Sequence, residues 1–227
     1  MVKATVLPRR VDLRARLMSV HDQGERPTCL AFAVTAAHEL IRASSAAVNE
    51  DLSEEALYWG GKQLDQGVRD GTSFSAAQGA LQQWGQPLEA VWPYDPLRDE
   101  SRLYRPPSGV KPGSRGWHRA GLRRIQHTVS SLRRELASER IVALGLVLTR
   151  GFYYPVAHWI PEPRAGQPTL GGHAVAIVGY DDNAPNPGRG GFLVRNSWGD
   201  SWADRGYGWL PYQYVQQLGK EAWIIDV

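Results

Sequence analysis

Cysteine is the scarcest residue in this chain, occurring once in 227 residues, at Cys29. A single cysteine excludes an intramolecular disulfide and leaves the thiol available for chemistry. Long apolar runs are missing as well, since no stretch approaches the roughly 18 residues that a membrane-spanning helix needs. These absences predict a soluble protein of a reducing compartment, which we take to be the cytoplasm, with no membrane partner. Export by a route that needs no signal stays open.

The first residues also lack a secretory signal, because Met1-Val-Lys-Ala-Thr-Val-Leu-Pro contains no apolar core. An excess charge of one sign is lacking too: the net charge is only +3, which does not favour nucleic-acid binding. One basic group near Trp117 could meet an acidic partner, but a solvated loop leading into a helix is the more frequent meaning of such a run. Its members are Arg115, His118, Arg119, Arg123 and Arg124.

The sequence also lacks a spacing typical of metal ligands. Five of the six histidines have no cysteine or carboxylate neighbours at ligand spacing, so the sequence predicts no metal and no cofactor. These five are His21, His38, His118, His127 and His158.

What the chain does contain is an apolar helical pattern that begins at its only cysteine. Residues 28–43 hold no Gly or Pro, are rich in Ala, and repeat their apolar positions at helical spacing. Thr28 is the predicted N-cap, which places the sulfur of Cys29 at the positive end of the helix dipole. Because a helix N-terminus and a neighbouring imidazolium both favour a thiolate, we expect a lowered pKa for this thiol.

Two later segments supply an imidazole and a carboxamide. His173 lies 144 residues after Cys29, and Asn196 lies 23 residues after His173. A lone cysteine is more often an inert buried residue than a nucleophile. However, the three groups occur in the order and near the spacing, about 130–150 residues from cysteine to histidine, of one class of thiol enzyme. The pattern therefore predicts nucleophilic catalysis by Cys29.

On these residues the chain resembles the papain-like cysteine peptidases, the family of papain and the cathepsins, over nearly its whole length. The matching segments are Asp22-Gln23-Gly24 with Cys29-Leu30-Ala31-Phe32, Leu52-Ser53-Glu54-Glu55, Asp70-Gly71-Thr72-Ser73, Trp84-Gly85, Trp92-Pro93-Tyr94, Gly172-His173-Ala174-Val175 with Val178-Gly179-Tyr180, and Asn196-Ser197-Trp198-Gly199 with Trp202 and Gly206-Tyr207.

The resemblance implies catalytic roles. Cys29 would be the nucleophile, His173 would accept and return its proton, and Asn196 would orient the imidazole. Gln23 would donate its side-chain amide to the oxyanion hole, together with the backbone N–H of Cys29. Trp198 would shield the histidine–asparagine hydrogen bond from water.

The resemblance also implies substrate contacts at Gly71, Thr72, Gly145, Gly172 and Ala174. Small residues at Gly145 and Ala174 would line the S2 pocket and leave room for an apolar or aromatic P2 side chain. A glycine inside a strand can equally mark a β-bulge.

The implied fold is α+β, a papain-like fold of two lobes in one domain that spans residues 1–227. The helical lobe would span about 12–105, and the antiparallel, β-barrel-like lobe about 106–227 plus the N-terminal strand, with the active-site cleft between them. Local patterns agree with this division. They predict helices at 28–43, 53–66, 73–84 and 128–138, a Gly85 that closes the third helix, a connection at 95–116, and strands at 141–148, 174–180, 191–196 and 222–226.

The chain departs from the family beside the nucleophile. Arg26-Pro27-Thr28-Cys29-Leu30 stands where the family usually has Cys-Gly-Ser-Cys-Trp, so the upstream disulfide cysteine is absent and Leu30 replaces the tryptophan that lines the primed side. Family members are commonly made with a long propeptide, but only 28 residues precede Cys29. We therefore expect activity without processing.

Three functions are compatible with these residues. The first is a cysteine peptidase that forms an acyl-enzyme and acts on peptide or protein substrates. The second transfers the acyl group to an amine, as a transpeptidase or a transglutaminase-like enzyme, or deamidates a side chain. The third is a silent peptide-binding module, which would not need Gln23, Cys29, His173 and Asn196 together. We expect the first, together with an inhibitor or regulatory partner that restrains it.

Overall fold

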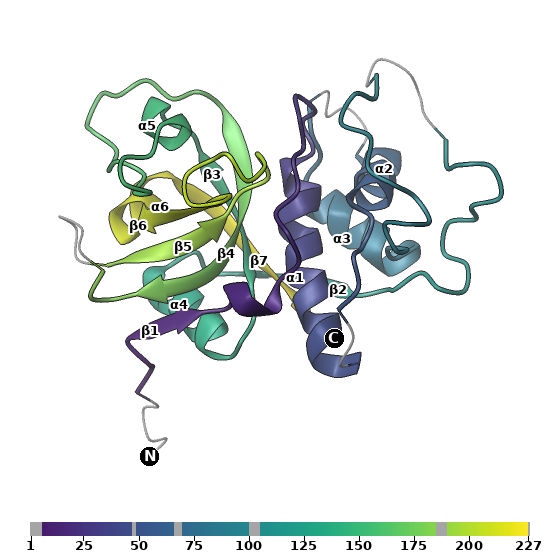
Figure 1. Cartoon of the computed structure of the whole chain (residues 1–227), viewed down its shortest axis with the longest axis horizontal. Helices are drawn as coiled ribbons and strands as arrows, with labels where there is room; N and C mark the ends of the chain where they lie inside the picture. The colour runs from purple at the N-terminus through teal and green to yellow at the C-terminus, as the bar shows by residue number, and fades with distance from the viewer. Residues whose placement is uncertain (1–5, 47–48, 66–69, 100–104, 185–189, 227) are drawn as a thin grey trace.

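The computed structural model describes residues 6–46, 49–65, 70–99, 105–184 and 190–226. Figure 1 shows helices on one side of the molecule and a sheet on the other, with α1 between them. The helical lobe contains α1 (Cys29–Ala46), α2 (Glu54–Leu64) and α3 (Phe74–Gln83). The three helices predicted for this part of the chain are thus confirmed, apart from residue 66, which lies outside the described residues.

Side-chain and glycine caps set the bounds of these helices. The Ser53 hydroxyl accepts the N–H of Ala56 at the start of α2, and the Ser73 hydroxyl accepts the N–H of Ala76 at the start of α3. Gly85 follows α3 with a φ of +82° and donates its N–H to the Ala80 carbonyl. Glycine adopts this left-handed conformation without strain, so the prediction that Gly85 closes the helix is confirmed.

The second lobe is an antiparallel sheet. Within the described residues its strands follow the order β2-β7-β3-β4-β5-β6, and β1 pairs with β4. The sheet is not closed into a barrel, because β2 and β6 stand at opposite ends of this order. The strands are β1 (Arg10–Asp12), β2 (Gly121–Ile125), β3 (Val142–Val147), β4 (Gly172–Asp181), β5 (Gly191–Arg195), β6 (Tyr207–Pro211) and β7 (Gly219–Asp226).

Short helices complete the sheet lobe. They are a 3₁₀-helix (Arg14–Arg16), α4 (Val129–Ala137), α5 (Arg150–Tyr153) and α6 (Tyr212–Leu218). The predicted helix at 128–138 is confirmed as α4, which begins at the N-cap Thr128. The four predicted strands are confirmed as β3, β4, β5 and β7. The predicted connection at 95–116 contains no helix or strand among its described residues, and residues 100–104 lie outside them.

Two strands were not predicted. The run that contains Arg123 and Arg124 was expected to lead into a helix, but it forms β2, in which two adjacent exposed arginines follow the buried Leu122 and break the strand alternation. The sequence of β6 is Tyr-Gly-Trp-Leu-Pro, in which glycine and proline conceal the strand pattern. Both strands lie at an end of the sheet order, where charged residues and proline are tolerated.

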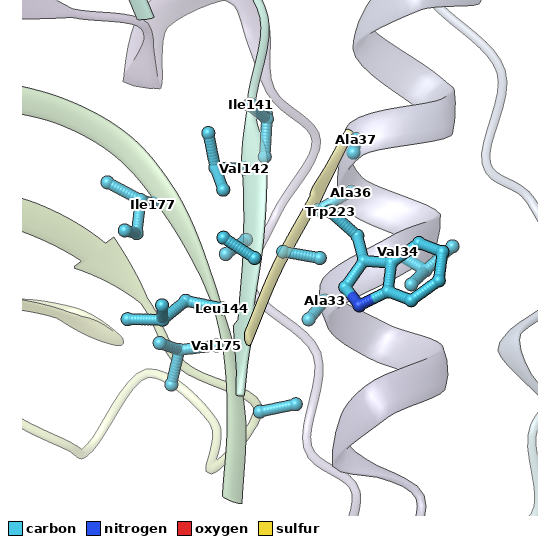
Figure 2. Close-up of a cluster of buried hydrophobic side chains, with 14 of the residues drawn as sticks. Ala33, Val34, Ala36, Ala37, Ile141, Val142, Leu144, Val175, Ile177 and Trp223 are labelled. Carbon is cyan, nitrogen blue, oxygen red and sulfur yellow. The ribbon is translucent and has the colours of Figure 1, made fainter. Parts of the chain in front are cut away.

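The core joins the two lobes through α1. Figure 2 shows Ala33, Ala36 and Ala37 on the side of α1 that faces the sheet, with the Trp223 ring of β7 against the helix, while Val142 points to the other face of the sheet. Small alanine side chains let the helix approach the strands closely, and α1 contacts β3, β4 and β7. This packing places the first residue of α1 against the sheet.

Among the described residues, no helix combines the length and the apolar character that crossing a membrane requires.

Candidate active site

The topology brings three distant side chains to one end of the interface between the lobes. Cys29 is the first residue of α1, which packs on β4, and His173 is the second residue of β4. Asn196 directly follows β5, the antiparallel neighbour of β4. Because neighbouring antiparallel strands run in opposite directions, the start of β4 and the end of β5 lie at the same edge of the sheet.

A hydrogen bond orients the imidazole of His173. Its Nε2 lies 2.8 Å from Oδ1 of Asn196, which also accepts the backbone N–H of Ser197 at 2.9 Å. An oxygen that accepts requires the proton on Nε2, which leaves Nδ1 with the free lone pair. Both residues are buried. His173 is therefore held as the tautomer whose basic nitrogen is Nδ1.

Aromatic rings enclose this hydrogen-bonded pair. The Trp198 ring lies 4.8 Å from the His173 ring, centroid to centroid, and the Phe152 ring lies 5.7 Å from it, edge to face. Tyr153 in turn stacks on Trp198 at 4.9 Å. The structure thus places Trp198 against the imidazole of His173. It adds Phe152 and Tyr153 of α5, a helix too short to give a periodic signal in the sequence.

The pKa of the Cys29 thiol differs from the sequence-based expectation. Burial of the sulfur is the largest influence and raises the pKa above its ordinary value, whereas the backbone N–H groups of Ala174, Leu30 and Cys29 lower it. The expected lowering of the pKa is therefore wrong for the resting site, because helix position alone does not reveal burial.

Burial also lowers the pKa of His173 to about 4, although its hydrogen bond to Asn196 raises it. Neither Cys29 nor His173 thus ionises readily by itself at neutral pH. An opposite charge close by would offset this cost, so a thiolate here requires a protonated imidazole beside it.

Thr28 stands at the predicted N-cap position, directly before the first residue of α1, but its side chain does not cap the helix. Its carbonyl accepts the N–H of Ala31, as expected at the start of α1. Its hydroxyl, however, lies 2.7 Å from the Tyr94 hydroxyl. Among the described hydrogen bonds, none joins this side chain to a backbone N–H of α1, so the predicted side-chain cap is not formed.

The Gln23 side chain is buried and held at both ends of its amide. Nε2 donates to the Arg26 carbonyl at 2.6 Å, and Oε1 accepts the Ser197 hydroxyl. An amide nitrogen carries two protons, so one N–H remains for a ligand. The same residue faces a cleft that also contains Cys29.

That cleft has a volume of about 750 Å³ and is lined by residues of both lobes. Nine of the ten predicted site residues line it, while Asn196 lies behind His173. The nine are Gln23, Cys29, Gly71, Thr72, Gly145, Gly172, His173, Ala174 and Trp198. Residues that the sequence analysis did not assign to the site also line it, among them Phe74, Tyr153, Leu170 and Glu221.

Gly145 was expected either to line the substrate pocket or to mark a β-bulge, and its position is compatible with both. The register between β3 and β7 shifts at Gly145, so it marks an irregularity in the sheet. It also borders the cleft, and a Cβ at this position would lie 3.2 Å from Phe74 and 3.3 Å from Glu221. A larger residue would therefore press on both side chains, which would have to move.

Comparisons with known proteins agree with this arrangement. The model of a family described as papain family cysteine protease matches residues 7–222. A peptidase C1-like protein of Acanthamoeba polyphaga mimivirus, described as uncharacterized, is 25% identical over 234 residues, covering 96% of this chain and 73% of that protein. A cathepsin L-like peptidase of Aedes aegypti is 27% identical over 212 residues, covering 88% of this chain and 58% of that protein.

A similar solved structure is that of xylellain, a cysteine protease from Xylella fastidiosa. It matches with a TM-score of 0.82 at 27% identity, over 98% of this chain and 87% of the other. The chain spans less than two thirds of the length of the Aedes aegypti relative but most of the length of xylellain.

Proposed function

The chain belongs to the papain family of cysteine proteases, and from this membership we propose that it hydrolyses peptide bonds with Cys29 as nucleophile and His173 as general acid and base. The observation that carries the proposal is the convergence of Cys29, His173 and Gln23 on one cleft. A histidine whose Nε2 is bonded to Asn196 supplies Nδ1 as the base that such chemistry needs.

In the first half of the reaction, Nδ1 of His173 takes the thiol proton and the sulfur attacks the carbonyl carbon of the peptide. Negative charge then moves to the carbonyl oxygen. The free N–H of the Gln23 amide and the backbone N–H of Cys29 stabilise this oxyanion. The protonated imidazole, stabilised by Asn196, gives its proton to the departing amine, which leaves a thioester on Cys29.

In the second half, water replaces the amine. His173 takes a proton from the water, and the hydroxide attacks the thioester through the same oxyanion site. Collapse of this intermediate breaks the carbon–sulfur bond, releases the carboxylic acid and returns the proton to Cys29. The open cleft admits water to this step.

The substrate is an extended peptide, since the cleft reaches well beyond Cys29 along both lobes. Gly71 and Thr72 provide a wall on the helical side, and this wall is anchored to α2. Lys62 donates to the Gly71 carbonyl, and the Thr72 hydroxyl donates to Asp65. Gly145, Gly172 and Ala174 form the opposite wall on β3 and β4.

The test of this function combines covalent labelling with substrate profiling. We expect an epoxide inhibitor of thiol peptidases to attach to Cys29, as measured by intact mass and peptide mapping. We also expect the protein to cleave a diverse peptide mixture, as measured by mass spectrometry of the products.

The Cys29→Ala variant serves as the control and should neither be labelled nor cleave peptides. If the protein is labelled and exchanges amides but cleaves no peptide, its reaction is acyl transfer and not hydrolysis. A protein that is neither labelled nor active would be a binding module. Cleavage that persists in Cys29→Ala would contradict the proposed nucleophile.

A second prediction concerns the space beside Gly145. Gly145→Val is expected to lower kcat/KM by about 10-fold or more for peptides that place Phe or Leu beside this position, because the valine side chain pushes Phe74 and Glu221 and narrows this part of the cleft. Peptides with Ala or Gly at the same position should lose less than about 3-fold. The two peptide series are compared on one enzyme preparation, and an equal loss for both series would show damage to the strand instead.

A further inference from the structure

We propose that Arg26 is a positioning residue of the oxyanion hole, because its buried guanidinium fixes the main-chain carbonyl that holds the Gln23 amide. The sequence pattern by itself indicates no role for Arg26. The inference rests on the proposed function, since it concerns the same oxyanion donor.

The guanidinium of Arg26 is fixed by contacts with two segments of the helical lobe. Nη1 and Nη2 donate to the two carboxylate oxygens of Glu55 on α2, and Nη1 also donates to the Asp95 carbonyl at 2.7 Å. Arg26 is 4% exposed and Glu55 is fully buried. This bidentate contact fixes the orientation of the guanidinium as well as its distance from the carboxylate.

Aromatic contacts add to this anchor. The guanidinium carbon of Arg26 lies 4.8 Å from the ring centre of Tyr94 and 5.5 Å from that of Tyr58. The Tyr94 hydroxyl donates to the Gln23 carbonyl at 2.8 Å. Arg26 and the backbone of Gln23 are thus attached to the same tyrosine, which ties the turn 23–26 to the helical lobe.

The carbonyl of Arg26 connects this anchor with catalysis. It accepts the Gln23 Nε2 at 2.6 Å and the Thr28 N–H at 2.9 Å. Pro27 restricts the backbone of the residue before it, which limits the direction of this carbonyl. Because Ser197 also holds Oε1 of Gln23, both ends of the amide are fixed and so is its plane. The second N–H of Nε2 therefore points in a single direction.

The position of Arg26 is informative as well. When the segment is compared with Cys-Gly-Ser-Cys-Trp, Arg26 falls where the resembling family has its upstream disulfide cysteine. Here a buried ion pair to α2 fixes the turn instead. Such an anchor does not depend on the redox state of the surroundings, which agrees with a chain whose only cysteine is the proposed nucleophile.

The test separates the oxyanion hole from the nucleophile by using two reactions of Cys29. Peptide hydrolysis requires the oxyanion donor, whereas alkylation by iodoacetamide requires a thiolate but forms no oxyanion. Arg26→Lys keeps the charge and loses the two-pronged geometry. We expect it to lower kcat/KM for hydrolysis by about 10- to 100-fold, mainly through kcat, and to change the alkylation rate by less than about 3-fold.

A double-mutant cycle with Gln23 tests the route of the effect. Gln23→Ala alone should lower kcat/KM by about 10²–10³-fold. If Arg26 acts through Gln23, adding Arg26→Lys to Gln23→Ala should cost less than about 3-fold more. If the loss in the double variant equals the product of the two single losses, Arg26 acts independently of the oxyanion donor, and the inference is wrong.

Controls keep the possible failures distinct. Arg42→Lys alters another arginine of an Arg–Glu pair, Arg42–Glu50 at the far end of α1, and should behave as wild type. If Arg26→Lys does not fold, Glu55→Gln takes its place with the same expectations. Equal losses in hydrolysis and alkylation, or wild-type hydrolysis, would overturn the inference. Wild-type hydrolysis by Gln23→Ala would instead contradict the proposed oxyanion role of Gln23.

Discussion

Replacing His173 by alanine is expected to lower kcat/KM for peptide hydrolysis by about 10⁴-fold or more, the order of loss seen when the general base of a catalytic triad is removed. The reason lies in the protonation states of the pair. Burial raises the pKa of the Cys29 thiol, so a thiolate at neutral pH needs the protonated imidazole as its counter-ion, although burial also lowers the pKa of His173 to about 4. The measurement is steady-state hydrolysis of a fluorogenic peptide.

The pH dependence of Cys29 alkylation gives an independent check. In the wild type the imidazole accepts the thiol proton, so alkylation should proceed near neutral pH. In His173→Ala the thiol must ionise alone, and because burial raises its pKa, the alkylation rate should rise only at alkaline pH. The alkylation curve moves to higher pH because the thiol pKa is raised: at each pH below this pKa, a smaller fraction of the thiol is ionised.

The matched control is His127→Ala, a histidine in the connection between β2 and α4. It should hydrolyse peptides at the wild-type rate. If His173→Ala kept hydrolysis within about 10-fold of wild type, its role as general base would be wrong. Thermal unfolding of both variants shows whether the fold has survived.

Much of the site could be predicted because its residues belong to short motifs with strong local constraints. Cys29 begins a helix that can be recognised from its alanine-rich pattern, and Gly85 ends another because its left-handed backbone favours glycine. His173 and Asn196 lie in apolar strand patterns at a characteristic spacing. The two-lobe fold was implied by the resemblance to the papain family, and the different periods of the apolar residues in the two halves agree with it.

The contacts between lobes and across turns could not be predicted in the same way. Arg26 and Glu55 are charged residues, which local patterns assign to solvent, but folding buries them against each other. The pKa of Cys29 depends on how closely α1 packs against β4, which is a tertiary property. Cytoplasmic location and a restraining partner stay predictions, because no feature of the fold bears on them.

The second large effect is expected at Glu39, a buried carboxyl on α1 that lies ten residues after Cys29. We expect Glu39→Gln to be more stable than the parent at pH 9 by about 4 kcal/mol and nearly equal to it at pH 5. Burial and the nearby carboxylate of Glu54 raise the pKa of Glu39 to about 8, although the N–H of Leu52, which Glu39 accepts, lowers it. Glutamine can still accept this N–H, but it never ionises.

The sign of the effect follows from proton binding. Between its ordinary pKa of 4.5 and about 8, Glu39 is protonated in the folded protein and ionised in the unfolded chain. The stability contributed by this carboxyl is present below pH 4.5 and is lost as pH rises through this window, at about 1.4 kcal/mol per pH unit. His38 and His173, whose pKa burial lowers to about 4, act in the opposite sense and lose stability as pH falls below 6.5.

Comparing the parent and Glu39→Gln at each pH cancels these histidine contributions, because both proteins contain them. The measurement is urea unfolding from pH 5 to pH 9, with Cys29→Ala in both proteins to prevent self-digestion. Glu139→Gln is the matched control, since its carboxylate is mostly exposed, and it should follow the parent curve. If the parent and Glu39→Gln kept a constant difference across this range, Glu39 would be ionised in the fold, and the α1 core behind Cys29 would be better solvated than its burial implies.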